Sequence, residues 1–313
     1  MKVFKGIVAF IIIIALIADI VLSFHVYNLV INRTENTQKQ SVQANAEIFE
    51  SYFPQNESDF FDKRIYEEVT ITSYDGLELK GYYLRARIPT SKTVILAHGY
   101  SSQGTFMGSY AKLYYEQFGY NVLLPDGRGH GNSEGAYTGF GWIDRLDYLK
   151  WIDFVISMHG QDSQLVLHGV SMGGATVLMT SGENIPKNVK AIVSDCAYTS
   201  VKEELQYQFQ QMYRFPGYAI LNTTSTITKL KAGYFFGEAS ALEQVKKSKA
   251  PILFIHGSAD DFVPSYMVNM LYKACNSEKD LLMIANAGHG AAYSTDPDGY
   301  VNKVNQFIEK YVK

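Results

Sequence analysis

The sequence predicts an α/β domain with a mostly parallel sheet, helices on both faces and an N-terminal hairpin. From residue 93 onward, short apolar runs alternate with segments of helical periodicity. These runs are continuously apolar, which is typical of parallel strands buried on both faces. Before them, two β-rich runs within residues 64–88 flank Asp75 and Gly76, a pair that favours a tight hairpin turn.

The alternation places each element in turn. Helices are expected over residues 109–119, 142–160 and 298–312, with another starting near Met172 and ending near residue 182. In sheets of this kind, functional groups lie where loops leave the carboxyl ends of the strands. Strands are expected at residues 93–99, from residue 120, and at 164–169, 189–198, 250–257 and 280–289.

Composition excludes several classes of protein. The chain has 313 residues, of which 47% are apolar and 19% charged, and its net charge is −3. A nucleic-acid binder would carry a strongly basic face, so no nucleic-acid partner is expected. Two cysteines are too few for a disulfide-rich scaffold. The chain has neither an H-E-x-x-H motif nor cysteines at zinc spacing, and the glycine-rich residues 126–135 lack the G-K-[ST] ending of a phosphate-binding loop. Hence we expect no metal and no cofactor.

Residues 6–31 form an apolar run long enough to cross a bilayer. Asp19, expected near mid-membrane, costs about 2.5 to 3.5 kcal/mol on an insertion scale. Thirteen Leu, Ile, Phe and Val residues between Ile7 and Phe24 return roughly 4 to 8 kcal/mol. Insertion is therefore favoured. The alternative is a cleaved signal peptide with an apolar core at residues 6–18, which Leu16 before the cleavage position disfavours.

The domain organisation follows from this segment. We expect a membrane anchor at residues 1–31, a polar stalk at 32–64 with a short helix near 44–52, and a folded domain at 65–313. A single-pass protein of the cell membrane with its domain outside is the expected location, and secretion after cleavage is the alternative. About fifty residues, 199–249, exceed what a sheet crossover needs and predict a helical cap.

Ser171 is the candidate nucleophile. It lies in the pattern G-x-S-x-G, which fixes only three positions and can occur by chance. Its position just past an expected strand carries more weight, because Gly169 and Gly173 permit the tight strand-to-helix turn that exposes a serine. The pattern therefore predicts a nucleophile elbow at Ser171.

A serine nucleophile needs a base and an orienting carboxylate. Of seven histidines, His289 alone follows the last expected strand. His98, His168 and His256 each precede a glycine at a strand end, where we expect contacts with the backbone.

The sequence offers four acids after strands. Asp260 is the preferred partner, because it is the first carboxylate after its strand, and Asp261 is the alternative. Asp126 is expected to be structural, and Asp195 is disfavoured because it precedes the cap.

Serine, acid and histidine in this order occur in the α/β-hydrolase arrangement. Five motifs stand in this order along the chain: AHGY at 97–100, DGRGHGNSEG at 126–135, GVSMGG at 169–174, GSADDFVP at 257–264 and GHG at 288–290. Through these motifs the chain resembles the α/β-hydrolase superfamily over residues 66–313, in the branch of monoacylglycerol-lipase-like and serine-aminopeptidase-like proteins. Membrane-anchored hydrolases of this build are familiar from Gram-positive bacteria.

The resemblance implies a catalytic triad of Ser171, Asp260 and His289, with the backbone N–H groups of Tyr100 and Met172 as the oxyanion hole. It favours cleavage of carboxylic esters through an acyl-enzyme. Aminopeptidase-like or acyl-transfer activity with the same residues is the alternative, and a non-catalytic surface protein is a third possibility.

The substrate is expected to be a small acyl ester or a peptide, and the cap is expected to select it. Glu203 and Glu204 are candidates to capture a free amine if the substrate is a peptide, although a solvated helix face is the favoured interpretation of these two residues. Cap residues expected to line an acyl pocket, or simply to pack the cap, are Tyr207, Phe209, Met212, Tyr213, Phe215, Tyr218, Tyr234, Phe235 and Phe236.

Overall fold

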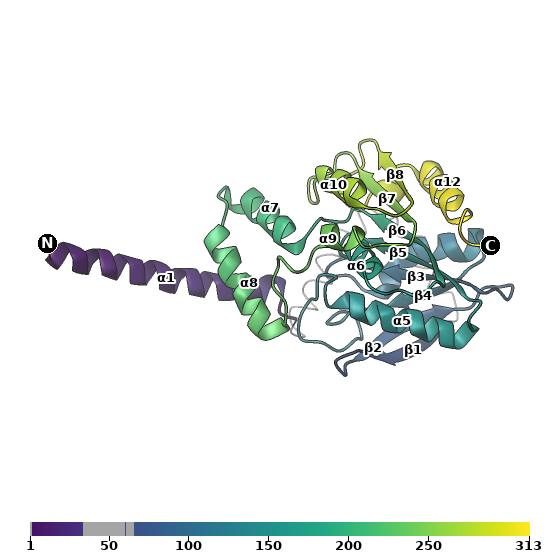
Figure 1. The fold of residues 1–313 in the computed structure, drawn as a ribbon, viewed down its shortest axis with the longest axis horizontal. Helices are drawn as coiled ribbons and strands as arrows, with labels where there is room; N and C mark the ends of the chain where they lie inside the picture. The colour runs from purple at the N-terminus through teal and green to yellow at the C-terminus, as the bar shows by residue number, and fades with distance from the viewer. Residues whose placement is uncertain (1, 34–59, 61–65) are drawn as a thin grey trace.

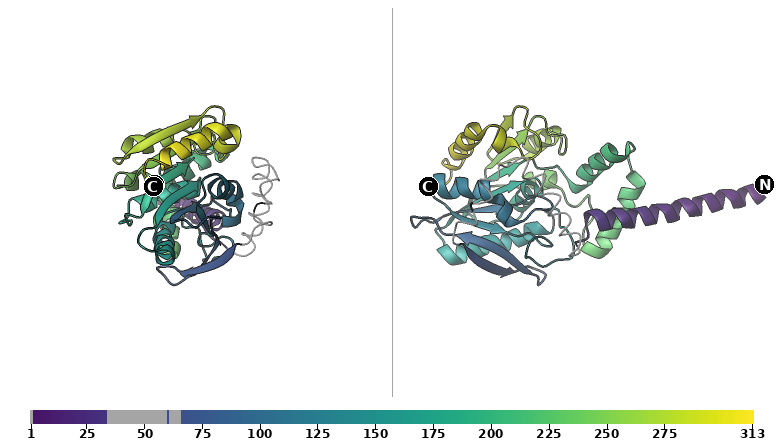
Figure 2. Two further views of the ribbon diagram at one scale, coloured as in Figure 1. Left: turned by 90° about the vertical axis from the view of Figure 1, so that its right-hand side faces the viewer. Right: turned by 180° about the vertical axis from the view of Figure 1, so that it is seen from behind.

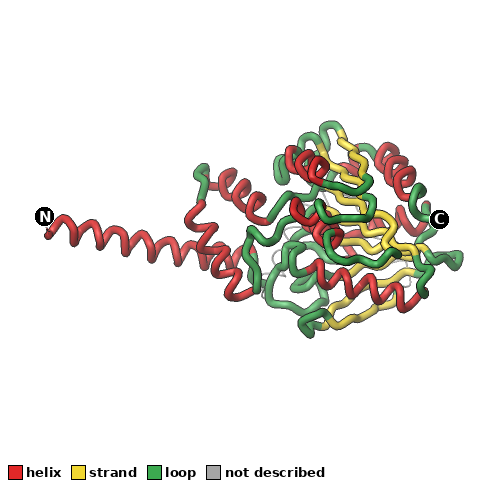
Figure 3. The backbone as a smooth tube through the Cα atoms, viewed as in Figure 1, coloured by secondary structure: helices red, strands yellow, loops and turns green. Residues whose placement is uncertain are grey.

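A computed structural model describes residues 2–33, 60 and 66–313. The short helix expected near residues 44–52 lies outside the described residues. A central sheet of eight strands has helices on both faces (Figures 1 and 3). The strands are β1 Glu67–Thr72, β2 Glu78–Leu84, β3 Lys92–Ala97, β4 Asn121–Pro125, β5 Gln164–Val170, β6 Val189–Asp195, β7 Ile252–Gly257 and β8 Lys279–Ile284.

Strand order confirms the predicted fold class. The order is β1-β2-β4-β3-β5-β6-β7-β8, with β1, β2 and β4 antiparallel and every pair from β4 to β8 parallel. The carboxyl ends of β5 and β7 therefore lie at the same edge of the sheet, one strand apart. The turn between β1 and β2 contains Gly76, whose φ of +93° suits glycine.

The helices outside α1 and the cap form two layers, one on each face of the sheet (Figure 2). One hydrophobic cluster joins the sheet to α5, α6, α9 and α10, and the other joins it to η1, α4, α11 and α12. Their bounds are α1 Lys2–Val30, η1 Gly104–Met107, α4 Gly108–Lys112, η2 Leu113–Gln117, α5 Asp144–His159, α6 Met172–Ser181, α7 Val201–Tyr213, α8 Tyr218–Ala232, α9 Ala241–Val245, α10 Tyr266–Ala274, α11 Ala292–Thr295 and α12 Pro297–Ile308.

The helix expected at 109–119 begins earlier than predicted. Helical structure starts at Gly104, whose N–H donates to Asp126 Oδ1 at 2.7 Å. A side chain at Gly104 would lie 2.6 Å from the carbonyl oxygen of Leu124, so the close approach requires glycine. Neither contact is visible in the helical periodicity of the sequence.

Helix α1 projects from the body of the protein at its N-terminal end, and its C-terminal part lies against α8 of the cap (Figure 1). Residues 3–18 are exposed, whereas Asp19, Ser23 and Tyr27 form a stripe that is partly or fully buried. This stripe packs on α8, where Thr223 Oγ1 donates to Asp19 Oδ2 at 2.6 Å and Ser23 Oγ donates to the Ile220 carbonyl at 3.0 Å. Asp19, which was expected near mid-membrane, thus lies where the helix meets the cap.

The first residues of the expected stalk are part of the folded domain. Asn32 forms a β-bridge with Tyr137, and the Arg33 N–H donates to the Ala136 carbonyl at 2.9 Å. The buried Arg33 side chain donates to Thr138 Oγ1 at 2.6 Å and to Ser101 Oγ at 3.0 Å. The chain thus passes from α1 directly into contact with the domain.

Replacing Arg33 tests how strongly this junction stabilises the fold. Because hydrogen bonds to a charged group contribute about 1.5 to 3 kcal/mol, Arg33→Ala should lower the free energy of unfolding by about that amount. Arg85→Ala is the matched control, since the Arg85–Glu67 pair is exposed and should contribute less than about 1 kcal/mol. Denaturant unfolding of both variants in detergent measures the difference, and equal losses would contradict the assignment.

Candidate active site

Ser171 lies on a strained turn between β5 and α6. Its backbone has φ of +59° and ψ of −120°, a conformation that costs a non-glycine residue free energy. A Cβ at Gly169 would lie 2.1 Å from the Gly173 carbonyl oxygen, and one at Gly173 would lie 1.9 Å from that of Ala97. Only glycine fits at these two positions, as the sequence predicted, because neighbouring backbone occupies the space.

His289 lies between Ser171 and Asp260. Its Nε2 is 2.8 Å from Ser171 Oγ, and its Nδ1 is 2.9 Å from Asp260 Oδ2. An ionised Asp260 can only accept, so Nδ1 carries the hydrogen and Nε2 is free to accept a proton from the serine. The structure therefore brings together the three residues that the sequence singled out.

Backbone and side-chain donors surround Asp260. Its Oδ1 accepts hydrogen bonds from the N–H groups of Phe262 and Val263, at 3.0 and 2.8 Å. Burial raises the pKa of this carboxyl, but hydrogen bonds from His256 and His289 outweigh that effect and hold the pKa at about 2. The carboxylate is therefore ionised throughout the neutral range. Asp261, the alternative acid, is exposed.

His256 contacts the acid directly, which the sequence did not predict. Its Nε2 lies 2.8 Å from the Val263 carbonyl and 3.2 Å from Asp260 Oδ2. The contact with Val263 is the expected backbone contact, whereas the contact with Asp260 fixes the orientation of the carboxylate. A histidine four residues before the acid, at the end of the same strand, is the signal that could have indicated it.

A chain of buried hydrogen bonds extends behind the site. Tyr300 OH donates to Asp195 Oδ2 at 3.0 Å and lies 3.0 Å from His168 Nε2, while His168 Nδ1 lies 3.1 Å from Tyr114 OH. The expectation of a backbone contact for His168 is therefore wrong, because two tyrosine side chains take that place. Burial lowers the pKa of His168 to about 3 and raises that of Asp195 to about 6.

The other strand-end residues have structural contacts. His98 Nε2 accepts from the N–H of Gly127 at 2.9 Å, and its Nδ1 lies 2.8 Å from the Gly99 carbonyl. Asp126 accepts hydrogen bonds from the N–H groups of Gly104 and Asn132, at 2.7 and 2.8 Å. Both residues therefore hold the loops that follow β3 and β4.

The residues expected to supply the oxyanion hole flank the serine. Met172 begins α6, directly after Ser171. Tyr100 follows Gly99, where an added Cβ would lie 3.6 Å from Ser171 Cβ. The loop after β3 thus passes close to the serine.

The end of α1 holds Tyr100 in place. Tyr100 OH donates to the Val30 carbonyl at 2.9 Å, and the Arg33 guanidinium lies 4.4 Å from the centre of the Tyr100 ring. Arg33 also bonds to Ser101, the next residue along the loop. Sequence reasoning missed this support because it assigned Arg33 to the stalk, seventy residues from the loop.

One group of side chains near the serine could hold a metal ion. Cys196, Asp260 and His289 each place a potential ligand atom within 4.8 Å of the others. Both nitrogens of His289 already contact Asp260 and Ser171. Burial also raises the pKa of the Cys196 thiol well above its usual range, so the thiolate that binds metals is disfavoured. Hydrogen bonding within the triad accounts for the cluster better than a metal does.

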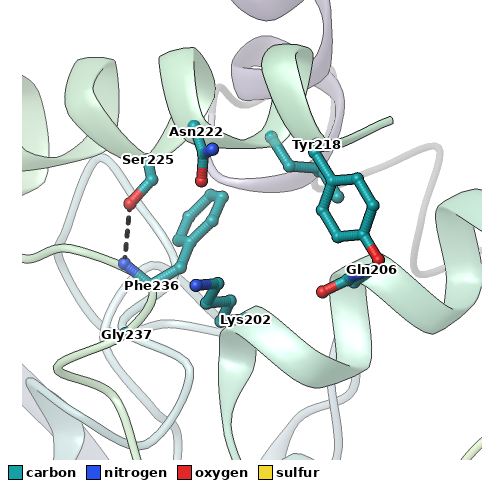
Figure 4. A pocket seen from close by; sticks show the side chains of 8 residues that line it. Lys202, Gln206, Tyr218, Asn222, Ser225, Phe236 and Gly237 are labelled. Atoms are coloured by element: carbon teal, nitrogen blue, oxygen red, sulfur yellow. Dashed lines mark hydrogen bonds between the residues drawn. The ribbon is translucent and has the colours of Figure 1, made fainter. Parts of the chain in front are cut away.

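The cap contributes α7 and α8 and encloses a cavity. The cavity measures about 120 Å³ and lies between these helices and the segment around Phe236 (Figure 4). Of the aromatic residues expected to line a pocket, Tyr218 and Phe236 border it. Tyr234 instead holds the cap against the rest of the domain, because its side chain is buried and its OH donates to the Thr138 carbonyl at 2.8 Å. The lining residues are Lys202, Gln206, Tyr218, Leu221, Asn222, Ser225, Phe236 and Gly237.

Helix α7 is bonded to the loop that carries Asp260. Gln208 Nε2 donates to the Phe262 carbonyl at 2.6 Å and to Glu204 Oε1 at 3.0 Å, and Tyr207 OH donates to the Asp261 carbonyl at 3.0 Å. Phe262 in turn lies against His289, with 4.9 Å between the ring centres. Burial raises the pKa of Glu204 to about 8.

Comparisons with known proteins agree with this architecture. Residues 106–313 match the model of the prolyl oligopeptidase family. The protein YqkD of Bacillus subtilis is 29% identical over 275 residues, which cover 88% of this chain and 87% of the relative. A Saccharomyces cerevisiae protein described as an uncharacterized membrane protein is 27% identical, over 78% of this chain and 79% of its own.

Solved structures share the fold. The Pyrococcus furiosus esterase Pf2001 has a TM-score of 0.64 at 23% identity, over 82% of this chain and 93% of the esterase. The Pyrococcus horikoshii acylaminoacyl peptidase has a TM-score of 0.56 at 20% identity, over 80% of this chain and 42% of the peptidase. The predicted superfamily and fold are confirmed, and the chain is a hydrolase by family.

The buried His168 should make stability depend on pH. Its pKa is lowered to about 3 in the folded state, so between about pH 6.5 and pH 3 the unfolded chain binds a proton that the folded chain does not. Stability should therefore fall as the pH falls through this range, by up to about 1.4 kcal/mol per pH unit from this residue. His168→Gln should show a shallower slope than the native chain in denaturant unfolding at several pH values. Identical slopes would show that His168 does not titrate in this way.

Proposed function

The chain belongs to the prolyl oligopeptidase family, and from this membership and the geometry of the site we propose that it is a serine hydrolase that cleaves carboxylic esters through an acyl-enzyme on Ser171. The observation that carries the proposal is the 2.8 Å contact between His289 Nε2 and Ser171 Oγ, with Asp260 on the other side of the ring. This is the arrangement that activates a serine hydroxyl.

The proposed reaction begins with proton transfer from Ser171 Oγ to His289 Nε2 as the oxygen attacks the ester carbonyl. Asp260, with a pKa of about 2, stays ionised and stabilises the imidazolium that forms. The imidazolium then protonates the leaving alkoxide, which leaves an acyl group on Ser171. Water, deprotonated by His289, releases the acid in the second half of the reaction.

The tetrahedral intermediate carries a negative oxygen that needs fixed donors. We propose the backbone N–H groups of Met172 and Tyr100 as these donors. Loss of one such donor typically raises the barrier by about 2.7 to 4 kcal/mol. The support that Arg33 and Val30 give to Tyr100 would hold this donor in position.

Amide cleavage is the second candidate, because the family takes its name from a peptidase. Capture of a free amine would need an ionised carboxylate in the cap. Burial raises the pKa of Glu204 to about 8, so this acid is mostly protonated at neutral pH. The Glu203 carboxylate accepts a hydrogen bond from Thr199 Oγ1, and the Glu203 N–H donates to Ser200 Oγ, the N-cap of α7. These two observations favour ester over peptide substrates.

We further propose that α1 anchors the protein in a membrane, with the domain outside. Residues Val3–Val30 are long and apolar enough to cross a bilayer, and the yeast relative is described as a membrane protein. Cleavage after residue 18 would leave the stripe from Asp19 onward packed on the domain, so the preference for an uncleaved anchor over a secreted form rests on Leu16, a bulky residue before the cleavage position.

A fluorophosphonate probe tests the nucleophile. It should label the native chain and Ser157→Ala, in which an exposed helical serine is replaced, and it should not label Ser171→Ala. Hydrolysis of p-nitrophenyl esters should fall by about a thousandfold or more in Ser171→Ala, because that variant lacks the nucleophile. Labelling of folded Ser171→Ala, or none of the native chain, would overturn the proposal.

The same preparation separates ester from amide chemistry. Rates on p-nitrophenyl esters are compared with rates on aminoacyl and N-acetyl-aminoacyl p-nitroanilides. We expect the esters to be cleaved faster. Faster anilide cleavage that depends on Ser171 would instead establish the peptidase alternative, and unlabelled, inactive protein would indicate a non-catalytic role.

A further inference from the structure

Large apolar side chains gather on the outside of the cap at the turn between α7 and α8. About half or more of each side chain is exposed, although the rings of Tyr213 and Phe215 also lie against the buried Phe209. We call this set the cap-turn surface; its members are Met212 at 64% exposure, Tyr213 at 52%, Phe215 at 48% and Tyr218 at 57%. The turn lies at the edge of the folded body from which α1 projects, as Figures 1 and 2 both show.

The length of the exposed part of α1 determines how deep the cap-turn surface would lie in a bilayer that α1 crosses. Residues 3–18 are exposed and rise about 24 Å at 1.5 Å per residue. The hydrocarbon core of a bilayer is about 30 Å thick, so a crossing that starts near Val3 ends close to residue 22. Asp19 and Ser23, which bracket that level, are the residues bonded to Thr223 and Ile220 of α8. The first turns of α8 therefore lie at the boundary between lipid and water.

The chemistry of the cap-turn surface suits this boundary. Tyrosine rings pair an apolar body with a polar tip and are enriched at membrane interfaces. Arg214, exposed between Tyr213 and Phe215, places a positive charge where anionic lipid headgroups lie. At the same level, Thr223 satisfies Asp19 Oδ2, which lowers the cost of a carboxyl near lipid.

Helix α7 connects the cap-turn surface to the loop that carries Asp260. Met212 lies about one helical turn along α7 from Gln208, which bonds to the Phe262 carbonyl. Phe262, itself 48% exposed, lies against the His289 ring. Contacts through Gln208 and Phe262 therefore connect the helix that carries Met212 to His289.

We propose that the cap-turn surface lies in the headgroup–acyl boundary of the bilayer that α1 crosses, and that the ester cleaved at Ser171 is part of a membrane lipid. The substrate half of this proposal rests on the proposed hydrolase function, whereas the docking half does not. A second copy of the chain is the competing occupant of an exposed apolar surface. The continuity of this surface with α1 favours lipid.

A fluorescent label tests the docking without any need for activity. Met212→Cys and Ile88→Cys in the full chain are each modified with nitrobenzoxadiazole in phosphatidylcholine–phosphatidylglycerol vesicles. Ile88 is 78% exposed and precedes β3, at the opposite end of the sheet from Ser171, and the native Cys196 and Cys275 are both buried. We expect blue-shifted emission at position 212 that nitroxide-labelled lipids quench, and water-like emission at position 88.

Two results of this experiment would overturn the proposal. Emission at position 212 that matches position 88 would place the surface in water. A blue shift that lipid nitroxides do not quench would place a second copy of the chain there instead.

Charges on the cap-turn surface test the substrate class. In Met212→Glu/Phe215→Glu, hydrolysis of a long-chain diacylglycerol embedded in vesicles should fall by about tenfold or more, and hydrolysis of soluble p-nitrophenyl acetate should stay within about twofold. Ile88→Glu is the control and should change neither rate. Equal rates on the lipid in native chain and variant, or loss of both activities together, would refute the lipid substrate. Failure of the native chain on p-nitrophenyl acetate would instead refute the hydrolase function itself.

Discussion

The close approach of three backbone segments fixes the position of Ser171, and the site depends on it. Gly169 lies against Gly173, and Gly173 against Ala97, at distances that leave no space for a Cβ atom. This contact forces β5 to turn sharply into α6 and gives Ser171 its positive φ. The N–H of Ser171 also donates to the Asp195 carbonyl, so β6 holds the turn from the other side. Contacts from the neighbouring strands β3, β5 and β6 thus offset the free-energy cost of the strained backbone at Ser171.

Hydrogen-bond donors decide the charge of the two buried carboxyls near this turn. Burial raises the pKa of both. Asp260 accepts two backbone N–H bonds and lies within reach of two imidazoles, so its pKa falls to about 2. Asp195 accepts one bond from Tyr300 on Oδ2, and its Oδ1 has no hydrogen-bond partner among the described residues, so its pKa rises to about 6. Asp260, the residue that faces His289, therefore stays ionised to a lower pH than Asp195 does.

Local sequence signals predicted the sheet and the three residues of the candidate triad, because Ser171, Asp260 and His289 each lie within five residues of the carboxyl end of a strand. Gly169 and Gly173 could also be assigned to the turn, because the G-x-S-x-G motif places glycines where a tight strand-to-helix turn leaves no space for a side chain. The contacts that the sequence did not reveal join distant segments. Asp19 meets Thr223, Arg33 meets Ser101 and Thr138, and His168 meets Tyr300, in each case through single polar atoms. Hydrophobic periodicity does not reveal such pairs, because they depend on how the helices and strands pack against one another.

These distant contacts make α1 a structural part of the folded domain. Its buried stripe holds α8 of the cap, and its last turn holds Tyr100 beside the serine. A domain on a flexible stalk would turn freely relative to its anchor, whereas Asn32 and Arg33 connect this helix rigidly to the loop around Tyr137. The direction from the helix axis to Ser171 is therefore set by packing. If α1 stands across a bilayer, the same contacts fix which surface of the cap faces the lipid, because the helix and the cap cannot reorient separately.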